Sequence, residues 1–262
     1  MIIRQEPNGQ LVHIGQTDHS RLVGQLAAHW GNAQFATPHP YEAVVRAATF
    51  HDFGWLRYET SPSINPQTGE PLGFGQHPFS QKHLDAQQWC IDWLADVEPY
   101  SGLIVSMHRT GLAQQRYQKI AHGSQRRPYQ PGSLRPELQA FVDRNEAWQK
   151  DQIERFGADE VWTNYCLQQV WDLLGLYFCC QEPYEEHIEP VPAGYDRAGT
   201  VRLTMRPAEG RRVVFDPYPF DQRPLRVQFA SKRLPLPSYP DEAAYRRAYF
   251  QAPVELLEYE LV

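Results

Sequence analysis

The segment from Asp159 to Cys180 constrains the fold more than any other part of the sequence. It contains the string LQQVWDLLGLYFCC, in which nearly every residue is apolar. A helix that is apolar on all sides has to be covered on all sides by other elements. We therefore expect a long helix here, at the centre of the core.

Asp172 interrupts this apolar segment. Burying a bare carboxylate costs several kcal/mol, so the side chain needs a cation or several hydrogen-bond donors. Two interpretations fit equally well: Asp172 pairs with an arginine or a cap inside the core, or it is a ligand of a metal ion.

Apolar residues recur at helical spacing in five further segments, which predicts five more helices. These segments are 17–31, 40–51, 80–96, 100–110 and 136–156. The stretch from Arg57 to Pro78 holds four prolines and three glycines without a regular period, and we expect a long loop that could serve as a lid.

Short alternating segments at the two ends of the chain predict strands. They are Met1–Gln5 and Leu11–Ile14, joined by a turn at Pro7-Asn8-Gly9, and Val201–Met205, Arg212–Phe215, Leu225–Phe229 and Val254–Leu261. The expected fold is mainly α, a helical bundle with a small added β-sheet from the C-terminal strands and the N-terminal hairpin. Residues 1–182 would form the helical domain and residues 183–262 a β-rich extension packed on it.

Charge and composition restrict the classes of partner. The formal net charge of −6 gives no basic field for nucleic acid, and the stretch from Arg116 to Arg135 is most simply a solvated loop. No apolar run is long enough for a signal peptide or a membrane span, so we expect a cytoplasmic protein. The four cysteines form no CxxC pair, and we expect reduced core residues.

Five polar residues besides Asp172 stand where metal ligands could stand. His51 and Asp52 close an apolar helix in ATFHDFGW, His108 ends a buried run in GLIVSMHRTGL, His83 lies in SQKHLDAQQW and His19 in TDHSRL. Taken singly, each has an ordinary alternative as a helix-end residue, a satisfied core histidine or a surface histidine. Their order along the chain is improbable as a coincidence.

That order resembles the histidine–aspartate (HD) domain superfamily. His19 matches its first histidine, His51-Asp52 its signature doublet and Asp172 its closing aspartate, while His83 and His108 fall where dinuclear members have two more histidines. Within the superfamily, the strings QTDHSRL and FHDFGW resemble a bacterial family of unknown function numbered 3891. The resemblance implies a helical HD core. HDFGW lacks the lysine that often follows HD-Gly in phosphohydrolases, so their phosphate contact does not carry over.

The resemblance also implies a cofactor of one or two divalent transition-metal ions. Mixed nitrogen and oxygen ligands suit Fe or Mn, and also Zn, Ni or Co. His19, His51, Asp52 and Asp172 would hold the first ion; His83 and His108 would hold a second, bridged by Asp52. His77 is a rival to His83 as a ligand.

Three functions remain open from the sequence. The first is a phosphohydrolase of a small anionic metabolite, with Asp52, Lys82 and Arg109 as catalytic or substrate-binding residues. The second is a di-iron oxygenase, because the same ligand order resembles the inositol oxygenase branch of the superfamily. The third is a non-catalytic scaffold or sensor that retains metal for stability.

Overall fold

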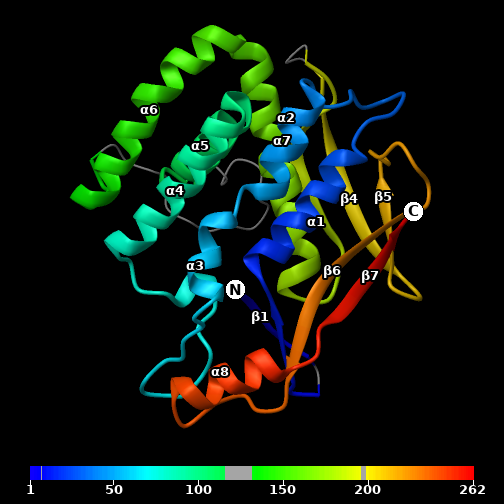
Figure 1. Ribbon diagram of the computed structural model, residues 1–262. Helices are drawn as coiled ribbons and strands as arrows, with labels where there is room; N and C mark the ends of the chain where they lie inside the picture. The colour runs from blue at the N-terminus through cyan, green and yellow to red at the C-terminus, as the bar shows by residue number, and fades with distance from the viewer. Residues whose placement is uncertain (7, 116–131, 196–198) are drawn as a thin grey trace.

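The structure is a computed structural model that describes residues 1–6, 8–115, 132–195 and 199–262. A group of helices packs on one side of a curled β-sheet (Figure 1). Pro7 of the expected turn and residues 116–131 of the expected basic loop lie outside the described residues.

The helices follow the apolar periodicity closely. All six helices expected from that periodicity are confirmed, with ends that shift by a few residues. They are α1 (Gln16–Ala28), α2 (Tyr41–Phe50), α4 (Gln81–Val97), α5 (Pro99–Ala113), α6 (Pro136–Phe156) and α7 (Ala158–Cys180). The expected loop between α2 and α4 carries three short helical turns, which are η1 (Phe53–Trp55), α3 (Leu56–Glu59) and η2 (Phe74–Gln76).

Helix α7 lies at the centre of the molecule, as its all-round apolar sequence predicts. It packs against α1, α2, α5 and α6 on its helical side and against β1 (Ile2–Gln5) and β3 (Glu186–Pro192) on its sheet side. Trp171, Leu174 and Phe178 have no exposed surface at all. Other elements therefore cover most of α7 near Asp172, and only Leu173 and Leu176 beside it are half-buried.

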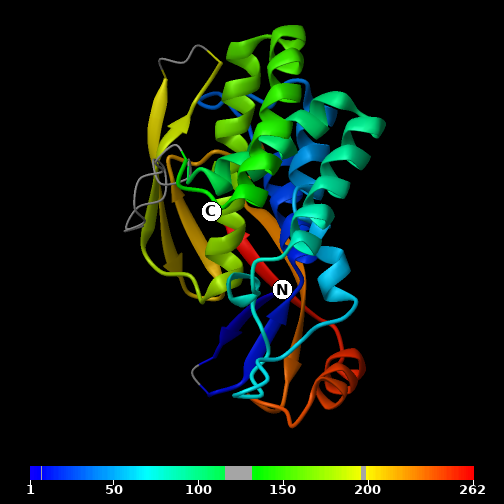
Figure 2. The same cartoon turned by 90° about the vertical axis from the view of Figure 1, so that its left-hand side faces the viewer.

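The strands form one seven-stranded sheet with the order β1-β2-β6-β7-β5-β4-β3. The remaining strands are β2 (Leu11–Ile14), β4 (Thr200–Ala208), β5 (Arg212–Asp216), β6 (Leu225–Leu234) and β7 (Glu255–Leu261). Only the β5–β7 pair among these neighbours is parallel. Because α7 contacts both edge strands, β1 and β3, the sheet must curl around it (Figure 2).

The expectation of a mainly α fold is therefore wrong. The described residues are 49% helical and 21% strand, and the sheet is a mixed half-barrel that forms one wall of the core, which makes this an α/β fold. The N-terminal hairpin pairs with β6 from the C-terminal region, with Val12 opposite Arg233. The expected boundary at residue 182 falls between α7 and β3, and one hydrophobic cluster includes residues from both sides of it.

Two elements were missed in the sequence for identifiable reasons. Strand β3 contains Pro190 and Pro192, which count against a strand, but β3 is an edge strand, where proline is tolerated. Helix α8 (Glu242–Gln251) has a polar sequence and buries only Tyr245.

The burial of the cysteines differs in part from the expectation drawn from the sequence. Cys90 and Cys179 are buried and Cys166 is half-buried, but Cys180 is exposed, so the expectation of four core cysteines is wrong for Cys180.

None of the helices in the described ranges combines the length and the hydropathy that a bilayer crossing requires.

His13 on β2 gives a prediction about acid stability. Its ring is buried beside Tyr245, with Nδ1 3.1 Å from the Met1 sulfur, and burial lowers the pKa of His13 from 6.5 to about 4. The unfolded chain takes up this proton near pH 6.5 and the folded chain near pH 4, so the stability contributed by neutral His13 is lost as the pH falls through that window.

We expect the free energy of unfolding to fall about 2 kcal/mol more between pH 6.5 and 4 in the wild type than in a His13→Gln variant. Urea denaturation at a series of pH values measures this difference. Parallel pH profiles for the two proteins would refute the assignment.

Candidate metal centre and pocket

The His51-Asp52 pair lies in a turn between two helical elements. His51 is the C-cap of α2, and Asp52 is the residue before η1, with φ −107° and ψ 10°. Gly54 follows because α4 passes very close: a Cβ there would lie 2.7 Å from the Gln87 Oε1 atom and 2.8 Å from the Ala86 carbonyl oxygen. The turn thus directs both side chains into the protein, where His51 is fully buried and Asp52 is 5% exposed.

His19 and His51 both face one carboxylate oxygen of Asp172. The Nε2 atom of His19 lies 3.0 Å from Asp172 Oδ1, and the Nε2 atom of His51 lies 3.2 Å from the same oxygen. These residues come from α1, the end of α2 and the middle of α7. Three potential ligand atoms from distant parts of the sequence therefore converge inside the core.

The other nitrogen of His51 fixes the chemistry of this arrangement. His51 Nδ1 lies 2.8 Å from the Ala48 carbonyl oxygen, which can only accept a hydrogen bond, so Nδ1 carries a proton. Nε2 of a neutral His51 then presents a lone pair to the lone pairs of Asp172. This contact is favourable only when a proton or a metal cation lies between them, and orientation by a backbone carbonyl is typical of metal-binding histidines.

The charges of the two groups agree with this conclusion. Burial alone would lower the pKa of His51, but Asp52 and Asp172 outweigh it and raise the pKa. Burial alone would raise the pKa of Asp172, but hydrogen bonds with His19 and His51 hold that pKa well below its usual range. Asp172 is therefore ionised, as a metal ligand must be.

Arg109 of α5 is the cationic partner of Asp52. Its Nη2 atom donates to Asp52 Oδ1 and, at 2.9 Å, to the His51 carbonyl oxygen. Burial raises the pKa of Asp52, but the Arg109 guanidinium and the nearby imidazoles outweigh it and lower the pKa. The second oxygen, Oδ2, lies 3.8 Å from His51 Nε2 and faces the centre of the cluster.

His108 completes a second group of potential ligands. One ligand atom each of His51, Asp52 and His108 lie within 4.8 Å of one another, as do those of His19, His51 and Asp172. Burial lowers the pKa of His108 to about 3, so its imidazole is neutral at physiological pH. The two groups share His51, and all five side chains are buried.

The donor set fits a divalent transition-metal ion. Neutral imidazole nitrogens and ionised carboxylate oxygens suit Fe, Mn, Zn, Ni or Co. The site offers both kinds of donor, and its central contact between His51 and Asp172 calls for a proton or a metal cation. His19, His51, Asp52 and Asp172 could hold one ion, with His108 beside them.

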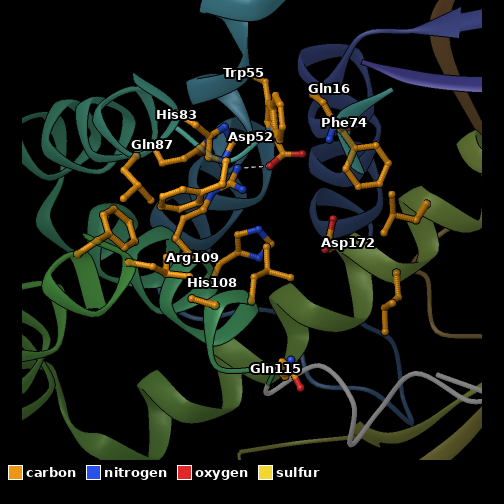
Figure 3. Close-up of a pocket in the computed structure, with 18 residues that line it drawn as sticks. Gln16, Asp52, Trp55, Phe74, His83, Gln87, His108, Arg109, Gln115 and Asp172 are labelled. Carbon is orange, nitrogen blue, oxygen red and sulfur yellow. Dashed lines mark hydrogen bonds and ion pairs between the residues drawn. The ribbon is translucent and has the colours of Figure 1, made fainter. Parts of the chain in front are cut away.

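A pocket of about 440 Å³ opens onto this cluster (Figure 3). Asp52, His108 and Asp172 line its inner end. Ten apolar or aromatic residues line the rest, namely Trp55, Phe74, Phe79, Leu84, Leu112, Ala113, Leu138, Phe141, Leu173 and Leu176. The volume suits a small organic molecule, and the walls suit one with an apolar or aromatic part.

The remaining predicted site residues are placed differently. His83 lines the pocket and packs against Trp55 with the ring centroids 4.6 Å apart, but it belongs to neither metal-ligating group found among the described residues. Burial lowers its pKa to about 4. His77 packs against Tyr58 and is not in the pocket lining. Lys82 is exposed, with Nζ 5.8 Å from the Tyr58 ring, and it is also outside the lining.

Several residues of the site were missed in the sequence. Ser20 lies with Oγ 3.0 Å from His51 Nδ1 and accepts a hydrogen bond from the Asp52 N–H, and Gln16 and Gln87 are buried in the pocket wall. Single polar residues of this kind form no motif and no periodic pattern in the sequence. The only indication in the sequence that Ser20 belongs to the site was its position next to His19.

Gly175 on α7 makes room for His19. A Cβ at Gly175 would lie 2.6 Å from the His19 Cε1 atom and 2.6 Å from the Val23 methyl Cγ2. We expect Gly175→Ala to displace the His19 ring and to weaken metal binding about tenfold or more. In a helix interior alanine is otherwise more favourable than glycine by about 1 kcal/mol, so a loss of stability in Gly175→Ala would come from this clash.

Titration with Mn²⁺ and thermal denaturation measure the two effects of Gly175→Ala. Gly75→Ala is the matched control, because a Cβ at Gly75 would meet nothing within 4 Å. Unchanged metal affinity in Gly175→Ala would mean that the position of His19 does not matter to the site.

Comparisons with known proteins identify the family but no activity. A search of curated proteins and a search of solved structures each found no match. The family model described as "Protein of unknown function (DUF3891)" matches residues 1–236 of the 262. The chain therefore belongs to the DUF3891 family.

Proposed function

We propose that this protein is a metal-dependent hydrolase of a small phosphate ester. The observation that carries the proposal is the convergence of His19 and His51 on one oxygen of Asp172, at the inner end of an apolar pocket. A site of this kind binds an ion and a substrate side by side. The likeness to HD-domain phosphohydrolases in residue order suggests the reaction type, and Fe or Mn is the preferred metal.

Several of the protein's own residues would have distinct roles in the reaction. Arg109 keeps Asp52 ionised and holds its Oδ1, which leaves Oδ2 free to bind the ion or to accept a proton from an attacking water. His51 is oriented through its Nδ1–H and the Ala48 carbonyl. A bound ion would supply Lewis-acid activation of water and of a phosphoryl oxygen.

The position of Arg109 favours a single ion over two. In a dinuclear centre, Asp52 would bridge the ions with its two oxygens, but Arg109 already bonds Oδ1. His83, the expected ligand of the second ion, lies close enough for Arg109 to contribute to its lowered pKa. The guanidinium thus supplies positive charge where a second ion would supply it, and the di-iron oxygenase becomes the weaker candidate.

Hydrolysis of p-nitrophenyl phosphate tests the proposal. The full-length protein is assayed with Mn²⁺, Fe²⁺, Co²⁺, Ni²⁺ or Zn²⁺, alongside p-nitrophenyl acetate as a carboxyl ester. We expect metal-dependent release of nitrophenol from the phosphate, and its loss in Asp52→Ala. Equal turnover by the variant, hydrolysis of the acetate alone, or oxygen uptake by the iron-loaded protein would overturn the proposal.

A further inference from the structure

The side chain of Gln87 is a feature of the pocket that the proposed function does not use. Gln87 lies on α4, is 3% exposed and lines the pocket. Within the described ranges, neither its Nε2 nor its Oε1 has a hydrogen-bond partner. An unpaired buried amide is costly, so native proteins rarely keep one without a purpose.

The position of this amide relates it to the metal centre. Its Oε1 lies against the backbone of Gly54, two residues after Asp52 in the same turn. Gln87 also lies one helical turn beyond His83 on the same face of α4, and Figure 3 shows both on the side of the pocket opposite Asp172. A molecule that reaches from the metal centre into the pocket would pass Gln87, whose amide has to turn toward the pocket to pair with it, because both polar atoms have almost no accessible surface.

The surroundings of Gln87 favour an uncharged, planar group. The pocket wall carries the flat rings of Trp55, Phe74 and Phe141. Arg109 is the one arginine or lysine in the lining that the structure describes, and it already bonds Asp52. A charged group beside Gln87 would therefore find no free cation of the protein there, whereas a flat neutral ring can pack on the aromatic side chains.

We infer that the pocket recognises its substrate through a planar, neutral amide, such as a lactam or carboxamide, which pairs with both polar atoms of Gln87. An amide edge presents one donor beside one acceptor, which is the complement of the Gln87 side chain. The inference rests on the proposed function, because it places the phosphate ester at the metal centre and the amide-bearing ring at Gln87.

A matched pair of probes tests this recognition. Benzamide and acetophenone share a phenyl ring and a carbonyl group, but acetophenone has a methyl group where benzamide has the NH₂ donor. Calorimetric titration measures both against the full chain, once with Mn²⁺ and once with EDTA. We expect the wild type to bind benzamide about tenfold more tightly, since its NH₂ group can donate a hydrogen bond to Gln87 Oε1 that acetophenone cannot make.

Gln87→Leu should reduce this preference to near unity while acetophenone still binds. Gln81→Leu, at an exposed position on the same helix, should keep the preference. No preference in the wild type, a preference that survives in Gln87→Leu, or tighter binding of benzoate than of benzamide with EDTA present would overturn the inference. The wild-type comparison decides the matter even if Gln87→Leu does not fold.

The same titrations separate this inference from the proposed function. Gln87 belongs to neither metal-ligating group, so its preference for benzamide should persist with EDTA. A benzamide preference in a protein that binds neither Mn²⁺ nor Fe²⁺ would refute the hydrolase and leave the amide site standing. Mn²⁺ binding without that preference would refute the amide site alone.

Discussion

Replacing Asp172 with Ala should weaken metal binding by more than about a hundredfold, the upper range for losing a residue that only supports a ligand. Asp172 is the carboxylate on which His19 and His51 converge, and removing it takes away the negative charge that binds the ion. Asp172→Asn keeps the shape but not the charge, and it should lose most of the same affinity. Titration with Mn²⁺ measures both variants.

Asp151→Ala is the control for this prediction. Asp151 is an exposed aspartate on α6 that belongs to neither metal-ligating group and does not line the pocket, so its loss should leave metal affinity unchanged. Circular dichroism checks that Asp172→Ala retains its helices. A folded Asp172→Ala protein that binds Mn²⁺ like the wild type would remove Asp172 from the metal site.

Replacing Arg109 with Ala should destabilise the metal-free protein by about 3–5 kcal/mol, because it leaves the buried Asp52 charge without its partner. Both side chains are nearly inaccessible, at 8% and 7% exposed. For a chain of this size the loss corresponds to a drop of roughly 10 °C in Tm. Since a bound ion compensates Asp52, Mn²⁺ should raise the Tm of Arg109→Ala more than that of the wild type.

The surface pair of Arg144 and Asp92 provides the contrast for Arg109. Its atoms lie 3.3 Å apart, but the side chains are 64% and 52% exposed, so Arg144→Ala should cost less than about 1 kcal/mol. A double-mutant cycle of Arg109→Ala with Asp52→Asn isolates the buried pair. A coupling no larger than that of the surface pair would contradict the account of Asp52.

The site residues that could be predicted from the sequence are polar residues that stand in apolar segments. Asp172 is a carboxylate inside an apolar helix, and His108 ends an apolar run, so each required a partner whatever the fold. The structure brings them together with His19 and the His51-Asp52 turn. Helix positions were predictable for a related reason, because periodicity is a local property of the chain.

The sheet and the pocket wall were harder to predict from the sequence, because both depend on contacts between distant segments. Whether β1 and β2 form a separate hairpin or join β6 depends on a pairing across more than 200 residues. Lys82 and Gln87 show the same limit, because both lie on α4 within one helical turn of the predicted ligand His83. The charged residue faces solvent and the neutral one lines the pocket, and the sequence around them does not distinguish the two faces.

The metal content of the purified protein tests the central claim most directly. The full chain is prepared without chelator or affinity nickel, dialysed against metal-free buffer and measured by elemental analysis, together with the Asp172→Ala variant. We predict about one equivalent of a divalent transition metal, Fe or Mn first, per wild-type chain and almost none in the variant. Wild-type protein that holds no metal and takes up none when Mn²⁺ or Fe²⁺ is supplied would contradict the account.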